Sequence, residues 1–294
     1  MHSTPSAGRP DLIVLALLAF AANSIFCRLG LQDGAIDAAS FTAIRLTSGA
    51  VMLLLLLTLR QRRQRALLQL AWRPAAAFCL FAYAILFSIA YLQLAAGTGA
   101  LILFGAVQLT MIGWSLANGN RPSGPEWLGI AMAAGGLLYL LLPGATAPPL
   151  LPAAAMASAG VAWGAYTLLG RGSQDALAGT AANFVLALPL GLLALLPMIA
   201  DAHLEADGVA YAIASGALAS GCGYAIWYRV LPTLTATAAA TLQLAVPVLA
   251  ALGGVALLSE PLHLQLMLSG ALVLGGIALV IRAGARRARR ERNA

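Results

Sequence analysis

The sequence predicts an all-α membrane protein with ten transmembrane helices in a 5+5 inverted repeat. Three observations predict this fold: a shortage of charged residues, ten long apolar segments and a similarity between the two halves of the chain. Of the 294 residues, 61% are hydrophobic and only 9% are charged, whereas a soluble domain carries about 25% charged residues. So few charges cannot cover a globular surface in water, which excludes a soluble enzyme, a nucleic-acid-binding domain and a disordered chain.

Ten apolar segments have the length that a spanning helix needs, roughly 20 residues. Gly, Pro, Asp or Arg residues separate them, at residues 32–37, 60–73, 97–99, 118–124, 143–149, 171–176, 201–207, 229–233 and 259–261. In the first half the predicted helices cover Leu12–Leu31, Ala38–Leu59, Pro74–Ala95, Thr98–Ala117 and Pro125–Leu142. In the second half they cover Leu150–Gly170, Leu177–Ala200, Gly208–Tyr228, Leu234–Leu258 and Leu262–Ile281.

The charged residues narrow the function classes further. All 17 basic residues are arginine, since the chain has no lysine. A Walker-type phosphate loop and a Schiff-base enzyme both need a lysine, so the chain cannot by itself be an ATP-driven pump. The net charge of +7 lies mainly in predicted loops and a tail, where arginine suits anionic lipid headgroups. We expect the lipid bilayer as a partner and no nucleic acid.

The arginine distribution also predicts the orientation of the bundle. With the N-terminus inside the cell, all but two of the 17 arginines fall in cytoplasmic loops and in the tail. The acidic residues of the outer loops are Asp33, Asp37, Asp201, Glu205, Asp207 and Glu260. The loop Arg60–Arg73 and the tail after Arg282 should therefore face the cytoplasm, the loop Asp201–Asp207 should face outward, and both termini should be cytoplasmic.

Tryptophan and cysteine positions fit a membrane-embedded bundle. Four tryptophans near predicted cytoplasmic helix ends resemble an interfacial belt: Trp72, Trp114, Trp127 and Trp227. Tyr228 can serve as an interfacial anchor in the same way. The three cysteines fall inside apolar segments, so we expect small buried hydrophobic residues rather than disulfide partners or metal ligands: Cys27, Cys79 and Cys222. We expect neither a metal nor a cofactor.

The two halves of the chain resemble each other. The stretch Gln108…Arg121-Pro122…Gly135-Gly136 lines up with Pro247…Glu260-Pro261…Gly275-Gly276, and Phe20…Asn23-Ser24…Arg28 lines up with Trp163…Tyr166-Thr167…Arg171. Because each half has five spans, an odd number, the second copy must be inverted relative to the first. Inverted repeats are a recurrent plan of secondary transporters, although helices rich in Ala and Leu also align by composition alone. The predicted units are residues 1–142, residues 143–281 and a basic cytoplasmic tail, 282–294.

These features resemble the EamA-type branch of the drug/metabolite transporter superfamily. The resemblance covers nearly the whole chain and rests on the ten spans, the pattern Pro247…Leu258-Ser259-Glu260-Pro261 and the Gly-Gly helix after it. The first half departs from that pattern at Gln108 and Arg121. Within the branch, the sequence is most similar to the YddG exporters of aromatic and other amino acids. The resemblance implies a multi-pass exporter of the bacterial inner membrane, with helices 1, 3, 4, 6, 8 and 9 around a cavity and helices 2, 5, 7 and 10 in support.

A transport cavity needs polar or aromatic side chains at depths where lipid makes them costly. The side chains predicted to contact the substrate are Asn23, Ser24, Tyr83, Tyr91, Gln108, Trp163, Tyr166, Tyr224 and Gln243. Tyr83, Phe87 and Tyr91 are four residues apart and share one helix face, and Trp163 is the tryptophan that lies away from the helix ends. Helix packing is the alternative role for aromatic stripes and buried amides.

Pro247 predicts a break in the ninth helix. It has no N–H for the carbonyl of Gln243, so that carbonyl is left free and the helix is expected to kink. The free carbonyl can receive a substrate ammonium, or it can be satisfied by a neighbouring hydroxyl or a water.

Arg28 and Arg45 are the two arginines outside the cytoplasmic set. Both are expected near the outer surface, either paired with Asp33 or Asp37 or bound to a substrate carboxylate. All ten carboxylates and all three histidines are predicted outside the middle of the spans. We therefore expect transport without an obligatory coupling ion, with Glu260 as the carboxylate that could dip inward.

The sequence thus predicts a secondary transporter that exports small, largely apolar solutes, aromatic and other amino acids among them, by alternating access, and not an enzyme. The alternatives are export of drugs or other metabolites and an intramembrane enzyme. A small-multidrug-type proton antiporter would need a carboxylate in the first helix, and an intramembrane enzyme would need a Ser/His pair or two Asp residues within spans. We expect a monomer, and the sequence leaves oligomers, the substrate and the direction of net flux open.

Overall fold

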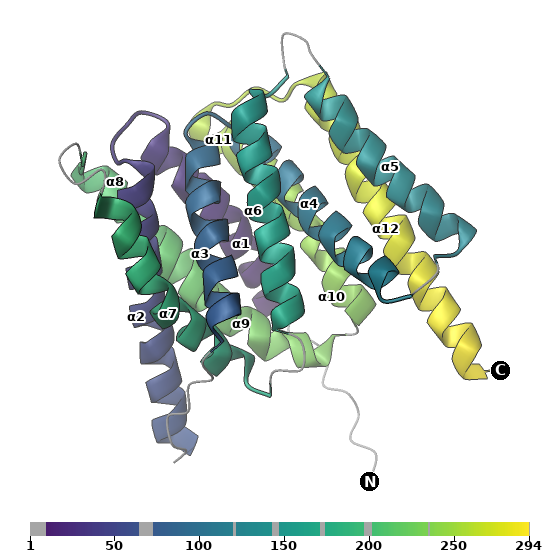
Figure 1. Ribbon diagram of the computed structural model, residues 1–294, viewed down its shortest axis with the longest axis horizontal. Coiled ribbons are helices and arrows are strands. Elements are labelled where there is room, and N and C mark those ends of the chain that lie inside the picture. Colours follow the sequence, from purple (N-terminus) through teal and green to yellow (C-terminus); the bar gives the residue numbers. More distant parts are fainter. Residues whose placement is uncertain are drawn as a thin grey trace.

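The apolar segments form helices because backbone N–H and C=O groups must pair with one another where no water reaches them. The computed structural model describes residues 10–64, 73–119, 122–142, 147–170, 174–196, 202–234 and 236–293. Predictions for Trp72, Arg121 and Asp201 lie outside these residues. The helices (Figure 1) are α1 Pro10–Leu31, α2 Ala38–Gln64, α3 Pro74–Tyr91, α4 Ala96–Ala117, α5 Gly124–Leu141, α6 Leu150–Leu169, α7 Ala176–Leu195, α8 Ala206–Ile213, η2 Ala214–Cys222, α9 Gly223–Val230, η3 Leu231–Thr233, α10 Ala236–Gln243, α11 Ala245–Leu258 and α12 Leu264–Asn293.

Ten helical segments follow one another in the described part of the chain, when α8, η2, α9 and η3 are counted as one helix and α10 and α11 as one interrupted helix. Eight of them are long and apolar enough to cross a membrane, and α11 is a shorter apolar helix. α6 has 20 residues, the length that a typical bilayer core requires. The predicted all-α membrane class is confirmed, and the inverted repeat stays a prediction.

The boundary between the third and fourth helices differs from the prediction. α3 ends at Tyr91 rather than at Ala95, and α4 begins at Ala96 rather than at Thr98. The N–H of Ala96 donates to both carboxylate oxygens of Glu260, at 2.8 and 3.1 Å. A carboxylate in this position stabilises the first turn of a helix, so the glycine-containing stretch after Ala96 lies inside α4.

The eighth and ninth predicted helices depart from regular α geometry. The middle of the eighth, η2, is a π-helix of nine residues, a rare form that is frequent at functional sites. The ninth is interrupted at Leu244, between α10 and α11. The interruption falls where Pro247 removes the donor for the Gln243 carbonyl and crowds that carbonyl.

The loop between α1 and α2 meets the segment before α8 at one end of the bundle. Ile36 and Leu204 form an isolated β-bridge, and the Glu205 N–H donates to the Ala35 carbonyl at 2.8 Å. The described members of the acidic set predicted in the outer loops lie at this end: Asp33, Asp37, Glu205, Asp207 and also Glu260, which lies beside the last turn of α1.

The opposite end of the bundle carries the first and last arginines of the predicted cytoplasmic loop, Arg60 and Arg73. Arg60 of α2 forms an ion pair with Asp175, and Arg73 donates to the Leu169 carbonyl at 2.9 Å. Asp175 also accepts from the Ala178 N–H at 3.0 Å and so caps α7. Burial raises the pKa of the Asp175 carboxyl, but Arg60 and the N–H donors outweigh it and hold the pKa below its usual value. Among the described residues, Arg60 and Arg73 of the predicted cytoplasmic loop therefore lie at the end of the bundle opposite to the predicted outer acidic residues.

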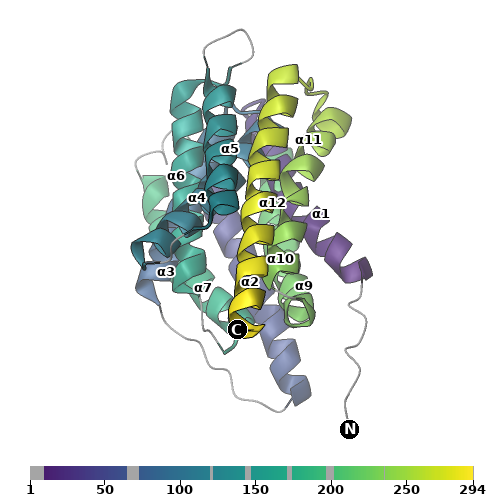
Figure 2. The same cartoon turned by 90° about the vertical axis from the view of Figure 1, so that its right-hand side faces the viewer.

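Glycines let α5 and α12 lie side by side at one edge of the bundle, where both also contact α4 (Figures 1 and 2). A Cβ atom added at Gly136 would come within 2.8 Å of the Leu272 Cβ, and one added at Gly276 within 2.5 Å of the Gly129 carbonyl oxygen. Larger side chains would push the helices apart. Of the first Gly-Gly pair only Gly136 lies at this contact, since Gly135 has nothing within 4 Å of such an atom.

The predicted orientation can be tested with two exposed positions, Gln174 at the Arg60 end and Ala206 at the Glu260 end. In a chain whose half-buried Cys79 and Cys222 are replaced by serine, a membrane-impermeant maleimide added to intact cells should label Ala206→Cys and spare Gln174→Cys. Permeabilised cells should label both, which controls for reactivity. Labelling of Gln174→Cys in intact cells, with Ala206→Cys protected, would reverse the orientation.

Candidate functional site

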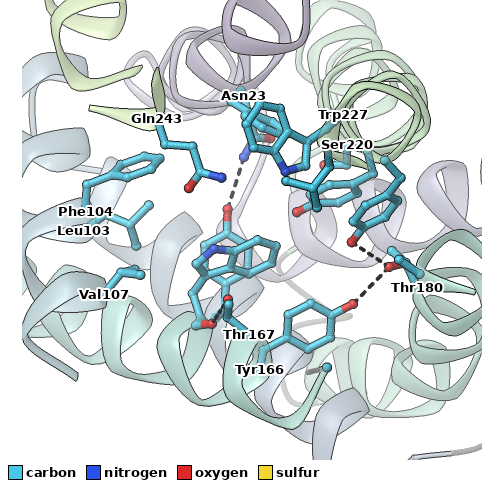
Figure 3. Close-up of a pocket in the computed structure, with 18 of the residues that line it drawn as sticks. Asn23, Leu103, Phe104, Val107, Tyr166, Thr167, Thr180, Ser220, Trp227 and Gln243 are labelled. Atoms are coloured by element: carbon cyan, nitrogen blue, oxygen red, sulfur yellow. Dashed lines mark hydrogen bonds between the residues drawn. The ribbon is translucent and has the colours of Figure 1, made fainter. Parts of the chain in front are cut away.

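A cavity of about 570 Å³ lies between the helices, within the range of roughly 300–1,000 Å³ typical of small-molecule sites. Residues from α1, α3, α4, α6, α7, η2, α9 and α10 line it (Figure 3). Eight of the nine side chains predicted to contact the substrate are among them: Asn23, Ser24, Tyr83, Gln108, Trp163, Tyr166, Tyr224 and Gln243. Their role in binding stays a prediction.

Trp163 is the centre of an aromatic wall on one side of the cavity. Its ring centroid lies 4.8 Å from that of Tyr83, 5.1 Å from that of Tyr166 and 5.8 Å from that of Tyr224. Tyr228 stacks on Tyr224, with centroids 6.1 Å apart. These five rings, which we call the aromatic wall, come from α3, α6 and α9 and form a face suited to a flat ring or an aliphatic chain.

A hydrogen-bonded group of polar side chains from α1, α2 and η2 surrounds the Tyr83 hydroxyl. Arg45 Nη2 donates to Tyr83 Oη at 3.0 Å, and Asn23 Nδ2 donates to the same oxygen at 3.2 Å. Ser215 of η2 donates to Asn23 Oδ1 at 2.6 Å, which fixes the orientation of the amide. We call these four residues the polar corner. All four are buried, so their hydrogen bonds form in a medium that strengthens them.

A second polar group lies on the α7 side of the cavity (Figure 3). Thr180 Oγ1 and Tyr228 Oη are 2.9 Å apart, and Asn183 Nδ2 and Thr180 each lie 3.4 Å from Tyr166 Oη. Sequence reasoning missed Thr180 and Asn183, because the resemblance assigned the seventh helix to support. Two polar residues three apart in an otherwise apolar span were the signal that could have found them.

Arg45 lies deeper than the sequence predicts. Its side chain is 2% exposed rather than at the outer surface or paired with Asp33 or Asp37. The guanidinium carbon lies 5.1 Å from the centre of the Tyr83 ring and 4.9 Å from that of Phe87, which are cation–π contacts. No described carboxylate forms an ion pair with it. The prediction was wrong because Arg45 lies about two turns inside α2, where it faces α3.

Arg28 also has a different partner from the predicted one. Its Nε lies 3.3 Å from Glu260 Oε1, and its Nη1 donates to the carbonyls of Tyr91 and Leu92 at 3.0 and 3.1 Å. Asp33 and Asp37 are therefore not its counter-ions. Together with the Ala96 N–H, these bonds tie α1, the end of α3, the start of α4 and the segment after α11 at one point. We call this set the outer latch.

Burial affects the carboxyl of Glu260, which lies in the segment between α11 and α12. Burial raises its pKa, and the Ala96 N–H and Arg28 lower it without cancelling the rise. The net direction is a raised pKa. In the outer latch the carboxyl accepts from both the Ala96 N–H and the Arg28 guanidinium.

Tyr91 is the predicted site residue that does not line the cavity. Its ring packs against Gly99, where an added Cβ would come within 2.5 Å of the ring, and its hydroxyl donates to the Ala96 carbonyl at 3.2 Å. Tyr91 lies away from the cavity because the stripe that starts at Tyr83 is about 12 Å long. The stripe extends past the cavity into the closed end of the bundle.

Trp227 and Tyr228 are not interfacial anchors. Trp227 is 5% exposed and lines the cavity beside Tyr228, and Phe20 packs edge-on against its ring, with centroids 5.8 Å apart. Trp114 and Trp127, in contrast, are more than half exposed, as an interfacial belt requires. The position of a tryptophan near a helix end does not reveal which face of the helix carries it.

The cavity reaches the end of the bundle that carries Arg73. The lining residues at this end are Arg73, Gly170, Ala176 and Leu231, and Gly170 is exposed. The residues of the outer latch are not among the lining residues. The structure therefore shows a bundle that is closed at the Glu260 end and open at the Arg73 end.

Comparison with known proteins agrees with this architecture. The sequence pattern of the EamA-like transporter family matches residues 150–282. A Pseudomonas aeruginosa protein described as uncharacterized protein PA1977 is 56% identical over 280 residues, which cover 95% of this chain and 96% of that protein. Through residues 150–282, the chain belongs to the EamA-like transporter family. This EamA-like protein is a multi-pass membrane transporter.

A solved structure shares the fold of this EamA-like transporter. It is a crystal structure of a protein that is 21% identical, with a TM-score of 0.60, and the match covers 90% of this chain and 95% of that one. At this identity the match extends to the fold alone. Neither the family, the Pseudomonas protein nor the solved structure is described with a substrate, and the cavity is therefore the guide to the solute.

Proposed function

We propose that this transporter exports small, largely apolar amino acids, aromatic ones among them, by alternating access through the cavity. The observation that carries the proposal is the junction of the aromatic wall with the polar corner. An aromatic or aliphatic side chain fits the wall, and the polar end of an amino acid fits the corner. A solute with one apolar end and one polar end is the class that this arrangement accepts best.

In this mechanism the solute enters at the Arg73 end, which faces the cytoplasm in the predicted topology. The outer latch then opens, while residues 1–142 and 143–281 rock against each other around the site. Two irregular segments border the cavity, η2 and the break at Leu244, and such segments are where helices bend. The proposed location is the bacterial inner membrane, with both termini in the cytoplasm and the chain as a monomer.

Counterflow in liposomes tests the proposal. Purified protein is reconstituted in liposomes loaded with one unlabelled amino acid, and uptake of the labelled form is followed for tryptophan, phenylalanine, leucine and aspartate. We expect uptake of the first three and little of aspartate, and none in protein-free liposomes. Export of drugs or other metabolites is the second candidate, because the aromatic wall alone suits flat apolar drugs. Counterflow of none of the amino acids would remove the amino-acid proposal in favour of it.

Transport should not depend on an ion gradient. No Asp, Glu or His side chain is among the described residues that line the cavity, and arginine does not titrate at physiological pH. A proton has no group to bind there as the bundle changes conformation. An imposed pH or sodium gradient across the liposomes should leave the final solute distribution at equilibrium. Accumulation above equilibrium with either gradient would contradict this prediction, and Glu260→Gln would then be the first variant to examine.

A further inference from the structure

We propose that Arg45 makes the cavity selective for a carboxylate group, acting through the hydroxyl of Tyr83. The inference rests on the proposed function and names the chemical class of its solutes: aromatic or apolar molecules that carry a carboxylate. Arg45 is a positioning residue in this proposal, because it does not line the cavity. Tyr83 lines the cavity and would touch the solute.

The first step is the unbalanced charge of Arg45. A guanidinium taken out of water is costly unless an anion or several hydrogen bonds compensate it. Arg45 has two ring faces and one hydrogen bond, to Tyr83, and its Nη1 is buried without a hydrogen-bond partner. No described acidic residue lines the cavity or pairs with Arg45. The empty cavity therefore lacks a negative charge that a bound carboxylate would supply.

The second step is the hydrogen-bond inventory of the Tyr83 hydroxyl. A hydroxyl has two lone pairs and one hydrogen. Its oxygen already accepts from Arg45 Nη2 and from Asn23 Nδ2, so the lone pairs are occupied. Its hydrogen has no acceptor among the described residues. Tyr83 can therefore only donate to a solute, and the bond from a cation makes it a stronger donor. It would accept nothing from a solute ammonium.

The third step is the support behind Arg45. The π-helix η2 packs directly on α2 at this residue: a Cβ added at Gly216 would come within 2.9 Å of the Arg45 carbonyl carbon. Ser215, one residue earlier, holds the Asn23 amide with its nitrogen toward Tyr83. One irregular segment thus positions both donors that occupy the Tyr83 oxygen. With its oxygen occupied by these two donors, the Tyr83 hydroxyl presents a hydrogen-bond donor, rather than an acceptor, to the cavity.

Binding of four matched indoles to the purified, full-length protein tests the proposal. The probes differ only at the polar end: 3-indolepropionate is an anion, tryptophan a zwitterion, tryptophanamide lacks the carboxylate, and tryptamine is a cation. Dissociation constants are measured by the thermal shift of the protein. We expect the two carboxylates to bind at least about tenfold more tightly than tryptophanamide and tryptamine, the range of a charge-assisted hydrogen bond.

Three variants separate an electrostatic role from a packing role. Tyr83→Phe keeps the ring and Arg45→Gln keeps a donor without the charge, and both should reduce the carboxylate preference to less than about threefold. Arg45→Lys should restore part of the preference. Tyr211→Phe, at a half-buried ring outside the cavity, should leave the preference unchanged. Because Tyr83→Phe preserves the shape of the wall, it tests the proposal even if Arg45→Gln does not fold.

The outcomes are distinct for the two proposals. Equal binding of tryptophan and tryptophanamide, or a parallel loss of all four probes with an unchanged ratio in Tyr83→Phe, would overturn the carboxylate proposal and leave amino-acid export standing. Binding of none of the probes would overturn it as well. A Tyr83-dependent preference without counterflow of any amino acid would support the carboxylate site and remove the export proposal.

Discussion

Replacing Trp163 with alanine is expected to lower transport at least about thirtyfold while the protein still folds and inserts. The ring contacts three others of the aromatic wall, and each such pair is worth roughly 0.5–1.5 kcal/mol beyond burial. A solute on this wall would lose the same contact and the burial of its own ring, about 1.5–3 kcal/mol. Since Trp163 borders the cavity, its removal enlarges an existing space instead of opening a hole in packed core.

Initial rates of counterflow at equal protein in liposomes measure this effect. Trp163→Phe should retain a larger share of the rate, because it keeps a ring at the centre of the wall. Trp114→Ala is the matched control: this side chain is 55% exposed and lies outside the cavity, so transport should persist. Normal rates for both Trp163→Ala and Tyr83→Ala would mean that these rings serve packing only.

The sequence was sufficient to predict the membrane class and most of the cavity. Polar and aromatic side chains inside apolar spans are costly toward lipid, so Asn23, Gln108 and Trp163 had to face either the cavity or another helix. Pro247 predicted the region of the helix break because the missing N–H is a local property of the chain. The features that could be predicted are those that depend on a residue and its immediate neighbours in the chain.

The polar partners could not be predicted, because they depend on which helices are neighbours. Arg28 pairs with Glu260, 232 residues away in the chain, and not with the nearby Asp33. Arg45 faces α3 rather than the surface because of the rotation of α2, which a nearly uniform apolar pattern does not reveal. The π-helix η2 is likewise set by packing against α2, at Gly216.

Replacing Glu260 with alanine is expected to open the outer end of the bundle. The change removes the acceptor for the Ala96 N–H and leaves Arg28, whose side chain is only 18% exposed, without its counter-ion. Hydrogen bonds to charged groups are worth roughly 1.5–3 kcal/mol each, so the open form should gain at least about tenfold in population. Ser24, which lines the cavity, then becomes reachable from outside.

Labelling of Ser24→Cys in intact cells by a membrane-impermeant reagent measures the opening, relative to the exposed Ala206→Cys under the same conditions. Glu260→Ala should raise the ratio at least about tenfold. Asp33→Ala, an exposed acid at the same end, should not change it. Glu260→Gln should have a smaller effect than Glu260→Ala, because the amide oxygen can still accept from the Ala96 N–H.

The raised pKa of the Glu260 carboxyl predicts how the outer latch depends on pH. A carboxyl whose pKa is raised in the closed form, compared with the same group in water, binds its proton more tightly when the latch is closed. Acidification through that pKa therefore stabilises the closed end, and this stabilisation is lost as the pH rises. The labelling ratio of Ser24→Cys to Ala206→Cys should fall as the outside pH is lowered, and Glu260→Gln should remove this dependence. A ratio that rises on acidification would mean that the ion pair with Arg28, rather than the neutral acceptor, holds the end closed.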